Sequence, residues 1–182
     1  MSLNGHKIAF LAKRGLEQPE LTEPWQAVLD AGGEPVLVSE EYGTITALVH
    51  DWDRGDDFEV DVTLDDVNPD DYLALVLPGG TLNSDKIRTN EKAQAFVKHF
   101  MDAGKPVAPI CHGAWILIET GTLTGRTLTS TLRIKTDLIN AGANWVDTEF
   151  HADGNLLSSR SPRDIEAFNA GIIKAFEEAA SK

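Results

Sequence analysis

The sequence has only one cysteine among its 182 residues, Cys111, so the chain cannot form an internal disulfide. A lone thiol suits a reducing compartment, and we therefore expect a cytoplasmic protein. No apolar run approaches the length of about 18 residues that a membrane-spanning helix requires. The first 15 residues also lack the long apolar core of a secretory signal peptide. We expect neither a membrane partner nor export.

Basic residues are also few, because 16 Lys and Arg stand against 29 Asp and Glu, which gives a net charge of −13. Nucleic-acid binding depends on clustered Lys and Arg, so we expect no nucleic-acid partner. The five histidines lack the paired spacing of a metal site. Neither a phosphate-binding loop nor a dinucleotide-binding glycine motif occurs. We expect no metal and no cofactor, and we interpret the acidic stretch 51–71 as a solvated face.

What the chain does contain is an ordinary globular composition, with 42% hydrophobic and 25% charged residues. The length suits one domain over residues 1–182. Hydrophobic patterning predicts alternating strands and helices, which favours an α/β fold with a mostly parallel sheet covered on both faces. The predicted strands are 7–12, 34–39, 72–77 and 107–110, and a hairpin is predicted within 40–70. Four helices are predicted: one after Pro24, one over 90–103, one after Cys111 and one that starts near Ser161.

Cys111 lies directly after the predicted strand 107–110 and is followed by His112, Gly113 and an apolar helix. A strand–turn–helix junction of this kind is typical of a nucleophile elbow. The N–H groups and the dipole of the new helix would favour a thiolate. Adjacent side chains at a sharp turn tend to point apart, so the spacing does not predict a contact between His112 and the thiol. The alternative is a small, inert hydrophobe at a strand end.

Two further features follow predicted strands and should meet Cys111, because ligands of α/β sheets bind at the carboxyl ends of the strands. Gly79 and Gly80 end the strand 72–77, and their backbone N–H groups could bind an oxyanion. The loop after the first strand carries Glu17 and Glu20, which could reach the thiol. Each feature also has a plain interpretation, as a glycine turn and as surface glutamates.

The chain resembles the PfpI family, which is related to the parkinsonism-associated deglycase and to the class I glutamine amidotransferase domains. The motifs that carry the resemblance are an early G-x-E-x-x-E-L, then L-V-L-P-G-G, then P-V-A-x-I-C-H-G. The similarity continues through residues 140–147 and 153–164, and so covers nearly the whole chain. The resemblance implies a flavodoxin-like three-layer sandwich and a homodimer or larger homo-oligomer.

The resemblance also implies roles for individual residues. It assigns Cys111 as the nucleophile, His112 as the catalytic histidine and the backbone of Gly80 as part of the oxyanion site. It implies that Glu20 hydrogen-bonds the reactive sulfur. The acidic partner of His112 would be Asp85, which would come from a neighbouring subunit.

Some positions depart from the family pattern. The family commonly has C-H-G-P and then a polar residue, whereas this chain has Ala114 and Trp115. Trp115 either narrows the pocket or packs below it, and we expect it to line the pocket together with Glu17 and Gly113. Thr131 stands where protease-like members have a tyrosine that lines the site. Its presence weakens an assignment as a peptidase.

The favoured function is a stress-related protein whose Cys111 acts as a hydrolase or lyase nucleophile on small carbonyl compounds, glycated adducts or peptides. The first alternative is a redox-responsive stress protein in which the thiol is oxidised to the sulfenic or sulfinic acid. The second is a binding or chaperone-like domain with an inert thiol. The favoured function and the redox alternative both require a reactive thiol.

Overall fold

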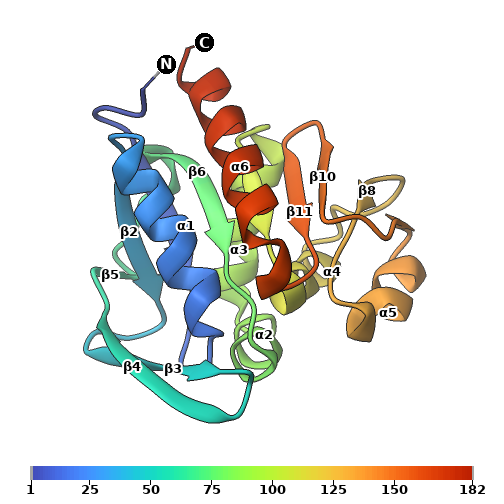
Figure 1. Ribbon diagram of the computed structural model, residues 1–182, viewed down its shortest axis with the longest axis horizontal. Helices are drawn as coiled ribbons and strands as arrows, with labels where there is room; N and C mark the ends of the chain where they lie inside the picture. Colours follow the sequence, from blue (N-terminus) through green and yellow to red (C-terminus); the bar gives the residue numbers. More distant parts are fainter. Residues whose placement is uncertain (1, 182) are drawn as a thin grey trace.

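A seven-stranded sheet forms the centre of the computed structural model, which describes residues 2–181 (Figure 1). The strand order is β10-β11-β7-β6-β1-β2-β5. All neighbouring strands are parallel except β10, which is antiparallel to β11 at one edge. The predicted mostly parallel, flavodoxin-like α/β sandwich is therefore confirmed.

The central strands are buried on both faces, as is typical of a parallel sheet between two helical layers. The four predicted strands agree with β1, β2, β6 and β7 to within one residue at each end. The strands of this sheet are β1 (Lys7–Leu11), β2 (Glu34–Ser39), β5 (Val62–Thr63), β6 (Tyr72–Leu77), β7 (Val107–Pro109), β10 (Phe150–Asp153) and β11 (Leu156–Ser159).

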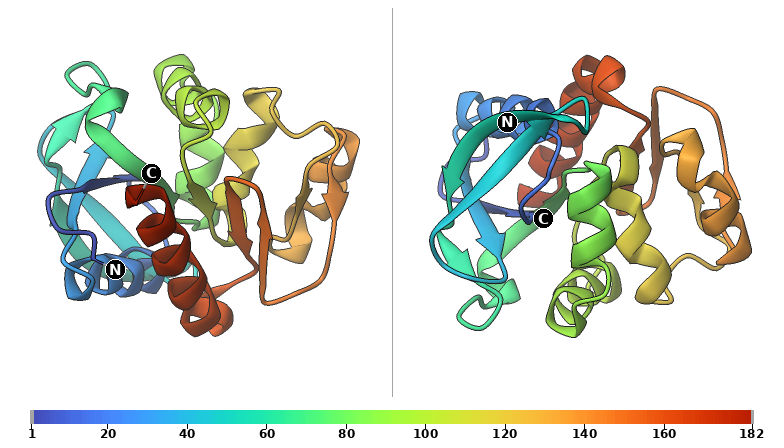
Figure 2. Two further views of the ribbon diagram at one scale, coloured as in Figure 1. Left: turned by 90° about the horizontal axis from the view of Figure 1, so that it is seen from above. Right: turned by 90° about the horizontal axis from the view of Figure 1, so that it is seen from below.

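Helices cover both faces of the sheet (Figure 2). Each face has its own hydrophobic core. One layer contains α1 (Gln18–Asp30) and α6 (Ile165–Ala180), and the other is built mainly from α3 (Glu91–Asp102). The short helices α2 (Thr81–Ile87), α4 (Ile116–Glu119) and α5 (Lys135–Asn140) extend the α3 layer. In the part of the chain that the structure describes, no helix has the length and apolarity to cross a membrane.

A hairpin of β3 (Thr44–Val49) and β4 (Asp53–Glu59) lies outside the sheet, near the carboxyl ends of its strands (Figure 1). It is hydrogen-bonded to the loop after β1, where Gly15 N donates to the carbonyl of Thr46 (2.9 Å). The hairpin was predicted within residues 40–70, but residues 62–63 join the main sheet as β5. A second small pair consists of β8 (Thr127–Leu128) and β9 (Asn144–Trp145).

Two predicted helix boundaries are wrong. Helix α1 begins at Gln18, not after Pro24. Pro19 fits the first turn of a helix, where its missing N–H has no helical partner to lose. The helix then continues through Pro24 with one backbone hydrogen bond fewer. The segment after the cysteine is a 3₁₀ turn over Cys111–Trp115, which α4 continues for only four residues. The first correction moves Glu20 from a loop into a helix.

Candidate active site

The backbone at Cys111 is a sharp elbow. Ile110 is still extended, but Cys111 has φ +59°, a left-handed conformation that is unusual for a residue with a side chain. Gly113 is buried behind this turn, where a Cβ atom would collide with the carbonyl oxygen of Leu77 in β6. Gly113 therefore allows the elbow to pack against the sheet.

The thiol of Cys111 and the imidazole of His112 are in contact, although the two residues are adjacent in the chain. Sγ lies 3.4 Å from His112 Nδ1. The left-handed backbone at Cys111 changes the relative direction of the two side chains, so the divergence that is usual for neighbours does not apply. His112 is only 3% exposed. A proton can pass directly between the sulfur and Nδ1.

The other ring nitrogen of His112 faces a hydroxyl and a carboxylate that the sequence interpretation missed. His112 Nε2 lies 3.4 Å from Thr81 Oγ1. The Thr81 hydroxyl donates to Asp51 Oδ2 (2.9 Å), and the Thr81 backbone N–H donates to Asp51 Oδ1 (2.6 Å). Asp51 belongs to the acidic stretch that we interpreted as a solvated face. No sequence spacing indicates this group, because Asp51 lies in the β3–β4 turn and Thr81 begins α2.

Glu17 holds that turn in place and does not face the thiol. Its two carboxylate oxygens accept the backbone N–H groups of His50 and Asp51, each at 2.8 Å. Both turn residues have positive φ, 57° and 60°, which is uncommon for side chains of this kind. Two charge-assisted hydrogen bonds stabilise this backbone. The predicted pocket residue Glu17 is thus an anchor of the hairpin.

Glu20 is fully buried in the first turn of α1. Its Oε2 accepts the backbone N–H of Gly79 (2.7 Å), and its Oε1 has no hydrogen-bond partner within residues 2–181. Burial raises the pKa of Glu20 well above its ordinary value, against the lowering effect of the Gly79 hydrogen bond, and the charge of Glu17 raises it further. The Cys111 thiol is close enough to perturb the same carboxyl. Burial thus favours the protonated, neutral form of Glu20 beside the sulfur.

Burial also raises the pKa of the Cys111 thiol, the neighbouring Glu20 carboxyl raises it further, and the backbone N–H of His112 has an opposing effect. Only a 3₁₀ turn and a four-residue helix follow Cys111, so the helix dipole that was expected to lower this pKa is short. Burial lowers the pKa of His112, and the charges of Asp51 and Arg133 act in opposite directions on it. The resting site therefore pairs a neutral thiol with a neutral imidazole.

The glycines after β6 differ in what they can offer an oxyanion. The N–H of Gly79 is already bonded to Glu20, and a Cβ atom at Gly79 would touch Cys111 Cβ at 3.0 Å. The N–H of Gly80 has no protein partner in the described part of the chain. Asn83 holds this loop by donating to the carbonyls of Pro78 and Gly79 at 3.1 and 2.9 Å. Gly80 is thus the free donor at this strand end.

Asp85 and Trp115 both contact Arg88. Asp85 is on α2, with a half-exposed carboxylate that pairs with Arg88 (3.4 Å), and within residues 2–181 it makes no hydrogen bond to His112. The Arg88 guanidinium stacks over the Trp115 ring at 4.7 Å, and Trp115 Nε1 donates to Asp137 (3.1 Å). Trp115 therefore packs beside the histidine and lines a separate cavity of about 420 Å³.

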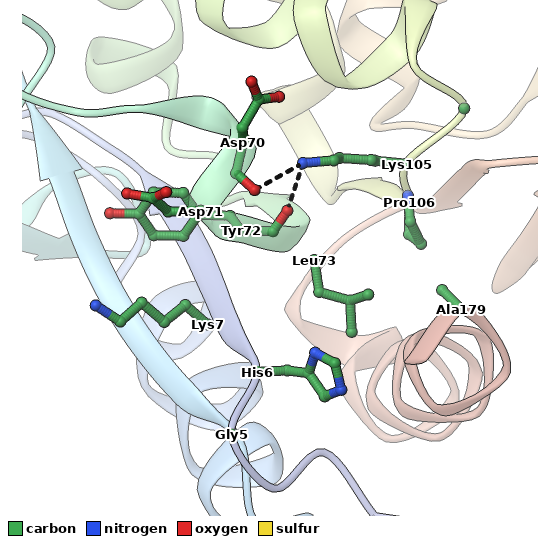
Figure 3. A pocket seen from close by; sticks show the side chains of 11 residues that line it. Gly5, His6, Lys7, Asp70, Asp71, Tyr72, Leu73, Lys105, Pro106 and Ala179 are labelled. Atoms are coloured by element: carbon green, nitrogen blue, oxygen red, sulfur yellow. Dashed lines mark hydrogen bonds between the residues drawn. The ribbon is translucent and has the colours of Figure 1, made fainter. Parts of the chain in front are cut away.

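A cavity of about 400 Å³ at the opposite edge of the sheet is not part of this site (Figure 3). It lies at the amino ends of β1 and β6, where Lys105 Nζ donates to the carbonyl of Tyr72 (2.8 Å). Within residues 2–181, no cluster of His, Cys, Asp and Glu has the arrangement of a metal site. The candidate chemistry is concentrated at Cys111, His112 and Glu20.

Comparisons with known proteins agree with this arrangement. The DJ-1/PfpI family model matches residues 6–175. The chain is 44% identical to Deglycase PfpI of Pyrococcus furiosus over 168 residues, which are 92% of this chain and 98% of the relative. A deglycase of Pyrococcus horikoshii has the same identity and coverage.

Solved structures share the fold. A two-domain protein of Anabaena variabilis, which contains DJ-1/ThiJ/PfpI-like and ferritin-like domains, superposes with a TM-score of 0.88 and 31% identity. The match covers 94% of this chain and 48% of that chain, so this chain spans about half of the two-domain protein. DJ-1 of Schizosaccharomyces pombe superposes with a TM-score of 0.82 at 18% identity. That match covers 96% of this chain and 97% of the DJ-1 chain.

Proposed function

The chain belongs to the DJ-1/PfpI family, and from this premise we propose that it is a cysteine-dependent hydrolase or lyase that acts on small carbonyl compounds and their glycated adducts. Relatives named as deglycases, at 44% identity, support this class over a peptidase. One observation carries the proposal: Cys111 Sγ lies 3.4 Å from His112 Nδ1. A nucleophile within reach of a base is the arrangement that covalent catalysis needs.

His112 acts as the general base in this proposal. Its neutral Nδ1 accepts the proton of the Cys111 thiol as the sulfur attacks the carbonyl carbon of the substrate. A C–S bond forms, and the carbonyl oxygen becomes an oxyanion that the free N–H of Gly80 can bind. The proton on His112 then passes to that oxygen, which gives a thiohemiacetal and restores the neutral imidazole.

The Thr81 hydroxyl and Asp51 fix the protonation of the ring. When Thr81 donates its hydroxyl proton to Asp51, its oxygen can only accept from His112, so Nε2 carries the hydrogen and Nδ1 is free to act as a base. The negative charge of Asp51 also favours the imidazolium that forms during attack.

Glu20 is the acid that faces the sulfur. Its Oε2 accepts from Gly79, so the proton of the neutral carboxyl belongs on the unpaired Oε1. A protonated carboxyl donates to a developing thiolate, whereas a carboxylate would repel it. The thiolate is then stabilised only when it forms, which suits a transition state more than the resting enzyme.

The experiment that tests the proposal measures turnover of methylglyoxal and of its adduct with N-acetylcysteine. We expect Cys111→Ser and His112→Gln to lower kcat/KM by about a hundredfold or more. His99→Gln, a change in the outer helix α3, is the control and should leave kcat/KM unchanged. Full turnover by the Cys111→Ser variant would contradict the proposal.

The redox alternative makes a different prediction. Oxidation by peroxide proceeds through the thiolate, and burial disfavours that form of Cys111 at neutral pH. We therefore expect slow conversion of Cys111 to sulfenic or sulfinic acid, measured by mass spectrometry after peroxide treatment. Rapid oxidation without turnover of either carbonyl substrate would favour the sensor.

A further inference from the structure

A cavity of about 590 Å³ concentrates positive charge in an otherwise acidic chain. Its lining includes Arg133, Arg160 and Arg163, which are three of the seven arginines in the sequence. The net charge of the whole chain is −13, so this grouping is against the general trend of the surface. Its volume is in the usual range for pockets that bind small ligands.

The cavity borders the elbow on the side of β11. The backbone N–H of Thr131, which lines the cavity, approaches the carbonyl of Cys111 at 3.4 Å. Ile110 pairs with Ser159 in a parallel bridge. The next residues along the two segments are Cys111 and Arg160, which are therefore neighbours.

The charge of Arg133 also reaches the imidazole. It is one of the charges that perturb the pKa of His112, and His112 contacts the thiol. A ligand group held by Arg133 would therefore lie near the proposed reacting atoms.

Only one of the three arginines is already neutralised. Arg160 donates to both oxygens of Asp164, at 2.8 and 3.0 Å, and to Asp147 at 2.8 Å. Arg133 and Arg163 have no carboxylate partner within residues 2–181. Because the two aspartates are the acids of the lining, the cavity keeps one excess positive charge.

We propose that this cavity is a carboxylate subsite of the active site, in which Arg133 and Arg163 bind the carboxylate of the substrate. The inference rests on the proposed function and names its substrate class: carbonyl compounds and adducts that carry a carboxylate. Planar guanidinium groups match a carboxylate in geometry. One excess positive charge suits a singly charged carboxylate better than a doubly charged phosphate monoester.

The test compares the alkylation of Cys111 by iodoacetate and by iodoacetamide, which differ in one carboxylate. We expect the ratio of the two rate constants, iodoacetate over iodoacetamide, to fall about tenfold or more when Arg133→Gln and Arg163→Gln are combined. Lys174→Gln on α6 and Lys92→Gln on α3 are combined in the control, which carries the same change of net charge and should keep the wild-type ratio. An unchanged ratio in the arginine double variant would overturn the subsite.

A second measurement does not need a reactive thiol. N-acetylglycine and N-acetylglycinamide are titrated into the full chain while the side-chain Nε–H signals of Arg133 and Arg163 are followed by NMR. We expect shifts with the carboxylate and none with the amide. The absence of shifts with N-acetylglycine would overturn the subsite even if Cys111 catalyses turnover, whereas a fully active Cys111→Ser variant would overturn only the catalytic proposal.

Discussion

At the scale of single residues, the most consequential feature is a carboxyl buried next to a thiol. Glu20 is 0% exposed, and only one of its oxygens is hydrogen-bonded. A buried carboxylate without a cation is costly, so the group keeps its proton. The protonated carboxyl is a hydrogen-bond donor beside Cys111, and its ionisation in the folded chain would lower the stability of the protein.

The proton of Glu20 predicts a specific dependence of stability on pH. Below pH 4.5 the carboxyl is protonated in both the folded and the unfolded chain. Above that pH the unfolded chain releases the proton and the folded chain keeps it, so stability falls by about 1.4 kcal/mol per pH unit until the folded carboxyl ionises. We expect Glu20→Gln to remove this slope. Urea unfolding of both proteins at pH 5, 6 and 7 checks it, and two parallel stability curves would contradict it.

Asp51 predicts a dependence of activity on pH. Its charge raises the pKa of His112, so Asp51→Asn should move the acid limb of the kcat/KM profile to lower pH. We also expect kcat to fall about tenfold, because the ring loses the carboxylate behind Thr81. Asp53→Asn in β4 is the matched control. A profile that keeps its acid limb in place would exclude Asp51 from the site.

At the scale of elements, the hairpin β3–β4 is what brings Asp51 to the active site. Its turn has two consecutive residues with positive φ, His50 and Asp51, and their N–H groups are bound by Glu17 from the start of α1. A helix start, a hairpin turn and the first residue of α2, Thr81, are thus joined by side-chain hydrogen bonds. The geometry of His112 depends on elements that are separate in the chain.

We therefore expect Glu17→Ala to act on the hairpin. Two partly buried N–H groups would lose a charged acceptor, and the free energy of unfolding should fall by about 2 kcal/mol. Hydrogen exchange at His50 and Asp51 should become faster, with kcat reduced in parallel. Glu23→Ala, an exposed position of the same helix, should change neither quantity. Unchanged hydrogen exchange at these two residues in the Glu17 variant would show that the turn keeps its conformation without Glu17.

At the scale of the whole molecule, assembly bears on the role of Asp85. Asp85 makes no hydrogen bond to His112 within residues 2–181, and the resemblance to the family implies that it acts on that histidine from a neighbouring subunit. We propose that the chain forms a homodimer or larger homo-oligomer in which it does so. Trp52 and Leu132 are exposed by 86% and 70%, and contacts between subunits would cover apolar surface of this kind.

Assembly predicts that activity per chain rises with protein concentration as subunits associate, measured together with sedimentation. Asp85→Asn should lower kcat/KM of the assembled protein about tenfold. Glu119→Gln is the control, because Glu119 also pairs with Arg88 but has no proposed role. A fully active monomer would remove Asp85 from the site and leave Asp51 as the only acid behind His112.

The parts of this protein that sequence patterns predict are those that depend on neighbours in the chain. Buried apolar runs predict the strands β1, β2, β6 and β7, and the strand–turn–helix junction predicts an elbow at Cys111, which has φ +59°. The three motifs predict membership in the family, which is confirmed over residues 6–175.

Tertiary structure decides which polar groups meet. Glu17 and Glu20 are three residues apart and look alike in the sequence, yet one binds a hairpin turn and the other is a neutral acid beside the thiol. Thr81 approaches His112, which is 31 residues away in the chain, and Asp51 is hydrogen-bonded to Thr81. Burial and hydrogen bonding set the charge of each group, and both depend on contacts between distant segments. Local sequence thus determines where Cys111 stands, and the folded chain determines which polar groups surround it.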